Sequence, residues 1–148
     1  MQIASLFRDK RTVLSLEIFP PKKTSPIEII YKTLDDLKDI SPDFISVTYG
    51  AGGNAGDTST ADIASNIKQK YSITPLAHLT CVNYTKEEVG QILDLLKEKG
   101  IKNVLALRGD INPNLPPKRE FRYASELVEY IKKRGDFYVS GACYPEGH

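Results

Sequence analysis

Four ionisable side chains stand within or directly after runs of apolar residues: Glu17, His78, Arg108 and Asp110. A carboxyl group can act as a general acid near neutral pH where burial raises its pKa. Desolvating unpaired charges inside a protein is costly, so a bound ligand or a reaction explains these charges better than packing does. The sequence therefore predicts a functional site that gathers these four side chains.

Five segments with the composition of β-strands carry these residues, and helical patterns separate the segments. The strand segments begin roughly every 30 residues, as expected for repeated βα units. They cover residues 13–20, 44–50, 75–81, 103–110 and 137–145. Apolar residues recur at helical spacing in four groups between them: Ile27, Ile30, Leu34 and Leu37; Ile63, Ala64 and Ile67; Val89, Ile92, Leu93 and Leu96; Leu127, Val128 and Ile131. This alternation predicts an α/β fold with a parallel sheet.

Two helix starts carry the pattern of a capping box, in which Ser or Thr precedes Glu by three residues. The pairs are Ser25 with Glu28 and Thr85 with Glu88. In such a box, each side chain bonds the backbone N–H of the other residue. We therefore expect helices to begin directly after Ser25 and Thr85.

The direction of side chains along each strand distinguishes an open, doubly wound sheet from a (β/α)8 barrel. One face of each strand is mainly apolar and suits packing on helices; in the segment 103–110 we assign Leu105 and Leu107 to that face and Val104 and Ala106 to the other. The second face turns polar toward the carboxyl ends of the strands, with Glu17, Thr48, His78, Thr80, Arg108, Asp110 and Tyr144. A sheet covered by helices on both faces would be apolar on both. The polar rim therefore favours the barrel, whose sites lie at the carboxyl ends of its strands.

The composition argues against several classes of partner. The chain has 20 basic and 19 acidic side chains and a net charge of +1, which is no electrostatic footprint for nucleic acid or an anionic membrane. No apolar run approaches the ~20 residues of a membrane helix, and residues 1–11 lack the apolar core of a secretion signal. Two cysteines do not make a disulfide framework. We therefore expect a cytoplasmic protein without a nucleic-acid or membrane partner.

The cysteines and histidines do not predict a metal site. His78 and Cys81 are three residues apart on one strand, which places them on opposite faces, and His148 is the one further histidine of the sequence. Structural zinc sites use four such ligands. By the same alternation Cys81 and Cys143 both face the helices, and we expect both thiols to be buried.

Six short motifs follow one another along the chain: SLEIFPPK at 15–22, FISVTYGA at 44–51, HLTC at 78–81, ALRGD at 106–110, YAS at 123–125 and YPEGH at 144–148. In this order they resemble the motifs of the methylenetetrahydrofolate reductase family, over nearly the whole chain. The resemblance implies a (β/α)8 TIM-type barrel that binds FAD. It also implies the reduction of 5,10-methylenetetrahydrofolate, the folate substrate, to 5-methyltetrahydrofolate. The electrons would come from NADH or NADPH, in ping-pong order through FAD.

The resemblance further implies roles for individual residues. Glu17 would be the general acid that helps to open the five-membered ring of the folate to an electrophilic iminium. Asp110 would lie beside the flavin ring and the folate and tune the flavin potential and substrate binding. The FAD site would be lined by Thr48, His78, Leu107, Arg108, Gly109, Asp110, Tyr123, Ala124, Ala142, Tyr144 and His148. Hydride transfer itself would belong to the flavin.

The chain is short for such a barrel, which needs about 250 residues. Its 148 residues hold five predicted strands and four predicted helices. We therefore interpret 1–148 as the N-terminal portion of a single (β/α)8 FAD-binding catalytic domain, truncated after the fifth strand, and expect it to be inactive alone. The first and fifth strands would be unpaired sheet edges, so we expect self-association through them, in a protein that forms a homo-oligomer.

Two other functions stay open from the sequence. The first is a different barrel enzyme, either a flavoenzyme of the proline-catabolism type or a lyase that uses a carboxylate and an arginine. The second is a chain that binds a ligand and catalyses nothing. The sequence does not distinguish NADH from NADPH.

Overall fold

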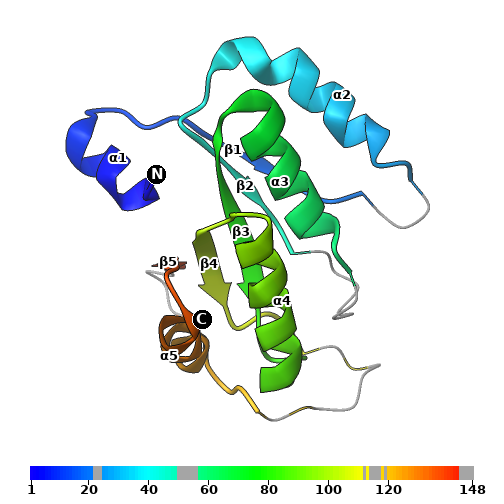
Figure 1. Cartoon of the computed structure of the whole chain (residues 1–148), viewed down its shortest axis with the longest axis vertical. Coiled ribbons are helices and arrows are strands. Elements are labelled where there is room, and N and C mark those ends of the chain that lie inside the picture. Colours follow the sequence, from blue (N-terminus) through cyan, green and yellow to red (C-terminus); the bar gives the residue numbers. More distant parts are fainter. Residues whose placement is uncertain (22–24, 50–56, 112, 114–117, 119, 144–148) are drawn as a thin grey trace.

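A sheet of five parallel strands forms the centre of the molecule, with helices on both of its faces (Figure 1). The computed structural model describes residues 1–21, 25–49, 57–111, 113, 118 and 120–143. In chain order the elements are α1 (Ile3–Asp9), β1 (Ser15–Ile18), α2 (Glu28–Leu37), the 3-10 helix η1 (Lys38–Ile40), β2 (Phe44–Val47), α3 (Ser59–Tyr71), β3 (Thr74–Thr80), α4 (Lys86–Glu98), β4 (Asn103–Leu107), α5 (Ala124–Arg134) and β5 (Tyr138–Gly141). All five expected strands and all four expected helices are present.

The strands follow one another across the sheet in chain order, β1-β2-β3-β4-β5, and every neighbouring pair is parallel. A doubly wound sheet reverses its order at a switch point, as in 3-2-1-4-5-6. An order without reversal is that of consecutive strands in a (β/α)8 barrel. The structure thus confirms the α/β fold and the first five strands of a TIM-type barrel.

The larger hydrophobic core lies between the sheet and the helices α2, α3, α4 and α5, which carry the four predicted apolar stripes. None of its following residues is more than 2 % exposed: Ile45, Val47, Ile63, Ile67, Ala77, Leu79, Val89, Leu93, Leu96, Leu127 and Ile131. In Figure 1, α2, α3 and α4 lie along one side of the sheet. The opposite side of the strands is the one that would face the inside of a closed barrel.

In β4 the two faces are the reverse of those predicted. The register pairs Leu105 with His78, so Leu105 and Leu107 face the side opposite the main core, whereas Val104 and Ala106 are buried in that core. The prediction was wrong because it gave the larger side chains to the helices. Small residues on β4 let the helices approach the sheet closely, and Leu105 packs against a second, smaller core.

A short helix that the apolar pattern did not reveal, α1, packs on the inner side of the sheet (Figure 1). Its buried residues Ile3 and Leu6 form the second core with Leu76. The Asn103 side chain anchors it, because Oδ1 accepts from the Ile3 N–H at 3.1 Å and Nδ2 donates to the Met1 carbonyl at 3.0 Å. A seven-residue helix is too short to be stable alone, so tertiary packing decides it.

One of the two expected capping boxes is present. The Glu88 N–H donates to Thr85 Oγ1 at 3.1 Å, and the Thr85 N–H donates to Glu88 Oε2 at 2.6 Å. The box expected at Ser25 is absent, because α2 begins at Glu28 with Ile27 at the N-cap and no side-chain cap. None of the described helices combines the length and the apolar character that crossing a bilayer requires.

The two thiols differ in exposure. Cys81 is buried in the main core, as predicted. Cys143 is exposed, so that prediction was wrong. It follows β5, an edge strand of the sheet, and Gly141 and Ala142 before it are exposed as well.

Candidate functional site

Glu17, Ser46 and His78 lie on three adjacent strands and meet on the inner side of the sheet. The register pairs Glu17 with Ser46, and Ser46 with Leu76, so His78 is the next inward residue toward the carboxyl end of β3. The Ser46 hydroxyl donates a hydrogen bond to Glu17 Oε2 at 3.1 Å. The same carboxylate oxygen lies 3.5 Å from His78 Nε2. The structure therefore brings two of the predicted site residues together, and Ser46, which was not predicted, bonds one of them.

The imidazole and the carboxylate differ in their contact with solvent. His78 is 8 % exposed, whereas 47 % of the Glu17 side chain is exposed. Burial lowers the pKa of His78, and the negative charge of Glu17 offsets this only in part. His78 is therefore neutral at neutral pH. Its buried Nε2 has no hydrogen-bond partner in the described part of the chain.

The backbone turns sharply after β4, at Gly109, which has a φ of +78°. A Cβ at this position would lie 2.8 Å from the Thr80 Cβ, so a larger residue is excluded by both conformation and space. The turn is fixed to the end of β3, because the Arg108 carbonyl accepts from the N–H groups of Cys81 at 3.1 Å and Val82 at 2.9 Å. This part of the carboxyl rim is thus shaped by backbone contacts.

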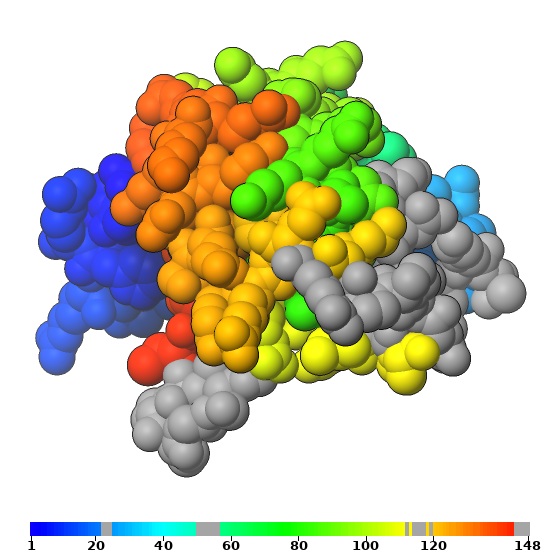
Figure 2. All heavy atoms as spheres, turned by 90° about the horizontal axis from the view of Figure 1, so that it is seen from below, coloured from blue at the N-terminus to red at the C-terminus, as the bar shows by residue number. Residues whose placement is uncertain are grey.

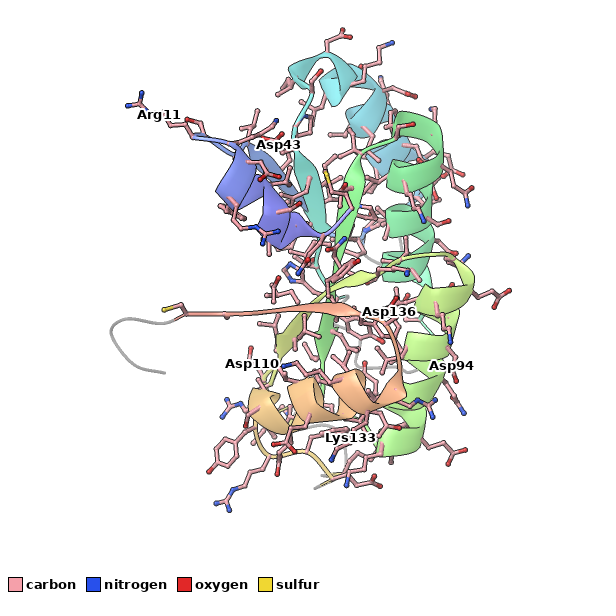
Figure 3. The ribbon with its side chains drawn as sticks, turned by 60° about the vertical axis from the view of Figure 1, so that its left-hand side comes forward. Arg11, Asp43, Asp94, Asp110, Lys133 and Asp136 are labelled. Atoms are coloured by element: carbon pink, nitrogen blue, oxygen red, sulfur yellow. The ribbon has the colours of Figure 1, made fainter. Side chains whose placement is uncertain are left out.

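Asp110 lies in the exposed segment that follows this turn and is labelled in Figure 3. Figure 2 views the molecule from the carboxyl ends of the strands, where this segment (yellow) is at the surface. The Asn83 side chain donates to the Asp110 carbonyl at 2.7 Å and holds the segment. Within the described residues, no hydrogen bond or ion pair joins the side chains of Arg108 or Asp110 to Glu17. The Arg108 side chain instead donates from Nε to the neighbouring Gly109 carbonyl at 3.1 Å, so the structure does not join these two predicted residues to Glu17.

The separation has a structural cause. The prediction placed Arg108 and Asp110 on the same face of the strand as Val104 and Ala106, and in the structure that face packs into the main core. In addition, β4 ends at Leu107. Beyond that residue the left-handed conformation of Gly109 redirects the chain. Strand alternation therefore no longer describes where these side chains point.

Three further residues predicted to line the flavin site end or follow strands. Thr48 follows β2, and its carbonyl accepts from Thr60 Oγ1 at 3.0 Å, which ties the end of β2 to α3. Leu107 is the last residue of β4 and pairs with Thr80. Ala142 follows β5 and is exposed. All three lie at the carboxyl ends of the strands, as predicted by the parallel sheet.

Tyr123 and Ala124 form the start of α5. The Glu126 carboxylate accepts from the N–H groups of Tyr123 at 3.0 Å and Arg122 at 2.5 Å, and these bonds hold the pKa of Glu126 below its usual range. Tyr123 is 54 % exposed, and the centroid of its ring lies 5.5 Å from the Arg122 guanidinium carbon. It is therefore a surface at which an aromatic ligand could stack. Two predicted residues lie outside the described part of the chain: Tyr144 and His148.

Two residues that contact the site were not among the predicted site residues, Ser46 and Asn83. Ser46 had a signal in the sequence, because it is a small polar residue on the inward face of the strand that follows Glu17. The partnership nevertheless depends on the register between β1 and β2, which one sequence does not specify. Asn83 lies in a loop between β3 and α4, where no periodicity applies.

A small cavity of about 170 Å³ lies between α3, α4 and the sheet. Its lining includes Tyr49, Thr60, Gln91 and Leu95, and it reaches β3 at His78. Ligand pockets usually measure about 300 Å³ or more, so this cavity is too small for a dinucleotide.

Comparison with known proteins connects the chain to one family. A family model described as methylenetetrahydrofolate reductase matches residues 2–148. The 5,10-methylenetetrahydrofolate reductase of Buchnera aphidicola is 39 % identical over 136 residues, which are 91 % of this chain and 45 % of the relative. Methylenetetrahydrofolate reductase (NADH) 1 of Zea mays is 36 % identical over 151 residues, covering 95 % of this chain and 24 % of the relative. The chain thus spans less than half the length of these relatives.

A solved structure shares the fold at low sequence identity. It is the 4-hydroxy-tetrahydrodipicolinate synthase of Methylacidiphilum fumariolicum SolV, with a TM-score of 0.63 and 13 % identity. The match covers 93 % of this chain and 46 % of that chain. At this identity the likeness shows the fold alone.

Proposed function

Because the chain belongs to the methylenetetrahydrofolate reductase family, we propose that it carries part of an active site that reduces 5,10-methylenetetrahydrofolate to 5-methyltetrahydrofolate. The observation that supports this proposal best is the contact between Glu17, Ser46 and His78 on the inner side of the sheet. It places a half-exposed carboxyl group where a substrate can reach it. The chain would be the N-terminal portion, residues 1–148, of a single (β/α)8 domain.

FAD is the cofactor that the family implies, and the residues present fit it. The buried Nε2 of His78 has no hydrogen-bond partner within the described residues and can bond a polar atom of a ligand. At Gly109 the backbone passes close to Thr80, and the rim beside it carries no bulky side chain at Ala142. Bound FAD would accept hydride from the nicotinamide and pass it to the folate.

The remaining flavin contacts are proposed along the rim of the sheet. Arg108 supplies a permanent positive charge that suits the phosphates of a dinucleotide. Asp110, on the neighbouring exposed segment, would place a negative charge beside the flavin ring and the folate. The other proposed contacts are Thr48, Leu107, Tyr123, Ala124, Tyr144 and His148.

Glu17 is proposed as the general acid for the folate. Opening the five-membered ring requires a proton on the leaving ring nitrogen, and a carboxyl group held in reach can supply it. Ser46 bonds the Glu17 carboxyl group on the inner side of the sheet, beside His78. The ionised carboxylate would then be opposite the positive charge of the iminium, which it stabilises electrostatically.

The electron donor is proposed to be NADH or NADPH. The name of the maize relative specifies NADH, so NADH is the first donor to test. Donor and folate would occupy the same open side of the sheet in turn, which is ping-pong order. Among the described residues, β1 and β5 are the two edge strands of the sheet. We propose that both edges pair with further chain, in the complete barrel or in a homo-oligomer.

The experiment compares the chain with a chimera in which the C-terminal part of the Buchnera relative follows it. Both proteins are mixed with FAD and desalted, and retained flavin is read from visible absorbance. The chimera is then reduced with NADH without oxygen and mixed with 5,10-methylenetetrahydrofolate, and flavin reoxidation is followed. We expect flavin and folate-dependent reoxidation in the chimera, and no turnover by the chain alone.

Glu17→Gln tests the acid in the chimera. We expect it to slow folate-dependent reoxidation by about 10²-fold or more and to leave flavin reduction by NADH unchanged. Glu129→Gln, an exposed carboxylate on α5, is the matched control and should behave as the unmodified protein. Reoxidation at an unchanged rate in Glu17→Gln would remove Glu17 from the acid role. Folded proteins that never retain flavin would instead favour a lyase or a silent binding protein.

A further inference from the structure

The Ser46 hydroxyl has two acceptors within reach and one hydrogen to give. Ser46 Oγ lies 3.1 Å from Glu17 Oε2 and 3.5 Å from the Leu16 carbonyl oxygen. A hydroxyl group donates one hydrogen bond and accepts up to two. Ser46 is 7 % exposed, so water does not readily replace either partner.

We propose that Ser46 is the positioning residue for Glu17, and that its hydroxyl reverses its hydrogen bond when Glu17 gains or loses its proton. With Glu17 ionised, the hydroxyl donates to Oε2. With Glu17 protonated, the carboxyl O–H donates to Ser46 Oγ, and the serine hydrogen turns to the Leu16 carbonyl. Glu17 thus keeps one partner, at one place, in both states of a proton-transfer cycle. The role of Ser46 in catalysis rests on the function proposed above, whereas its hydrogen bond to Glu17 does not depend on that function.

The local structure explains why the bond sets the direction of Glu17. The Glu17 side chain is 47 % exposed and long enough to turn into solvent. Its two inward contacts are Ser46 on β2 and His78 on β3. His78 Nε2 lies 3.5 Å from Glu17 Oε2 and makes no hydrogen bond among the described residues. Ser46 therefore provides the short contact. The pKa of His78 depends on whether the Glu17 carboxylate lies against the imidazole.

The reporter is the titration of His78, which Glu17 influences through its charge. Among the described residues, Glu17 is the group whose charge changes the pKa of His78. It raises this pKa, whereas burial lowers it by more. The chain contains two histidines, so ¹⁵N-histidine spectra contain two imidazoles. His148→Gln assigns them, and His148 otherwise serves as the internal control.

The experiment titrates His78 in the unmodified chain and in Ser46→Ala, Glu17→Gln, the double variant and Ser46→Thr. We expect Ser46→Ala and Glu17→Gln each to lower the pKa of His78, because the carboxylate no longer lies against the ring. The double variant should match Glu17→Gln alone, since Ser46 acts through Glu17. Ser46→Thr keeps the hydroxyl and should titrate as the unmodified chain.

Two results would overturn the proposal. The first is an unchanged His78 titration in Ser46→Ala. The second is a Ser46→Ala effect of equal size with and without Glu17, since that is what a general structural disturbance near the imidazole produces. Dispersed amide spectra establish that each variant is folded, and Ser46→Cys, of similar size with a weak donor, replaces Ser46→Ala if the latter is not.

Kinetics in the FAD-loaded chimera separate this proposal from the function. Ser46→Ala should slow folate-dependent reoxidation by about 10-fold, leave reduction by NADH unchanged, and be rescued by Ser46→Thr. A chimera that reduces no folate even without substitution would refute the proposed function. The histidine titration would still decide the role of Ser46.

Discussion

Glu17 Oε2 lies 3.5 Å from His78 Nε2 although β2 separates the strands that carry the two residues. Alternate strands of a sheet are about 10 Å apart, so two side chains meet across an intervening strand only if that strand presents a small residue between them. Ser46 is that residue. The contact therefore depends on three strands in one register, and it places a carboxyl group beside a neutral imidazole on the inner side of the sheet.

We expect the buried imidazole to make the folded chain less stable in weak acid. The pKa of His78 is lowered from 6.5 by burial, so between the two pKa values the unfolded chain binds more protons than the folded one. The stabilisation is complete above the unfolded value and is lost as the pH falls below about 6.5 toward the folded value. Urea unfolding at a series of pH values between about 7.5 and about 5.5 measures this slope.

The control for this prediction uses the second histidine. His78→Gln should flatten the slope over this range, and His148→Gln should retain it. Three carboxylates have lowered pKa values: Asp35, Asp43 and Glu88. They change the unfolding free energy below about pH 4.5, outside the range of this measurement. A slope that survives in His78→Gln would contradict the assignment.

Gly109→Ala should destabilise the rim of the site by about 1–3 kcal/mol. The cause is twofold, a φ of +78° that disfavours an L side chain and a Cβ placed 2.8 Å from the Thr80 Cβ. Gly141→Ala is the matched control, because a Cβ at Gly141 meets nothing within 4 Å. Its free energy of unfolding in urea should change by less than about 0.5 kcal/mol. Equal losses in both variants would show that glycine is not specifically required at the turn.

Thr85→Ala should cost about 1 kcal/mol of unfolding free energy. It removes the acceptor for the Glu88 N–H at the start of α4, where the capping box is complete. Ser25→Ala makes the same chemical change before α2, where no side chain caps the helix. Thermal or urea unfolding should therefore leave Ser25→Ala unchanged within about 0.5 kcal/mol. The reverse order would mean that α2 begins earlier than Glu28.

The two cysteines should differ in their reaction with a thiol reagent. Burial raises the pKa of Cys81 to about 12, and its thiolate is then scarce at neutral pH. Cys143 is exposed. An Ellman assay should count one rapidly reacting thiol in the folded chain and two in urea. Cys143→Ser should remove the rapid reaction, and a rapid reaction that remains would show that Cys81 is accessible.

Much of the architecture follows from local chemistry in the amino-acid sequence. Apolar residues at helical and strand spacing predict the four main helices and five strands, because each pattern describes the side of an element that is buried. The polar rim also follows, since a residue such as His78 is costly to bury without a purpose. Glu17, in contrast, is half-exposed in the structure. Thr85 and Glu88 predict their helix start correctly, whereas Ser25 and Glu28, at the same spacing, do not, because α2 begins at Glu28.

The remainder was decided by contacts between residues distant in the chain. The helix α1 exists because Ile3 and Leu6 reach Leu76, and Asn103 anchors the chain end. Which face of β4 is turned to the helices depends on packing, which selects the smaller residues Val104 and Ala106. The Glu17 site depends on inter-strand register, and the positions of Arg108 and Asp110 depend on a turn at Gly109. Periodicity describes one element at a time, so it specifies which side of an element is buried but not which residue of another strand it will contact.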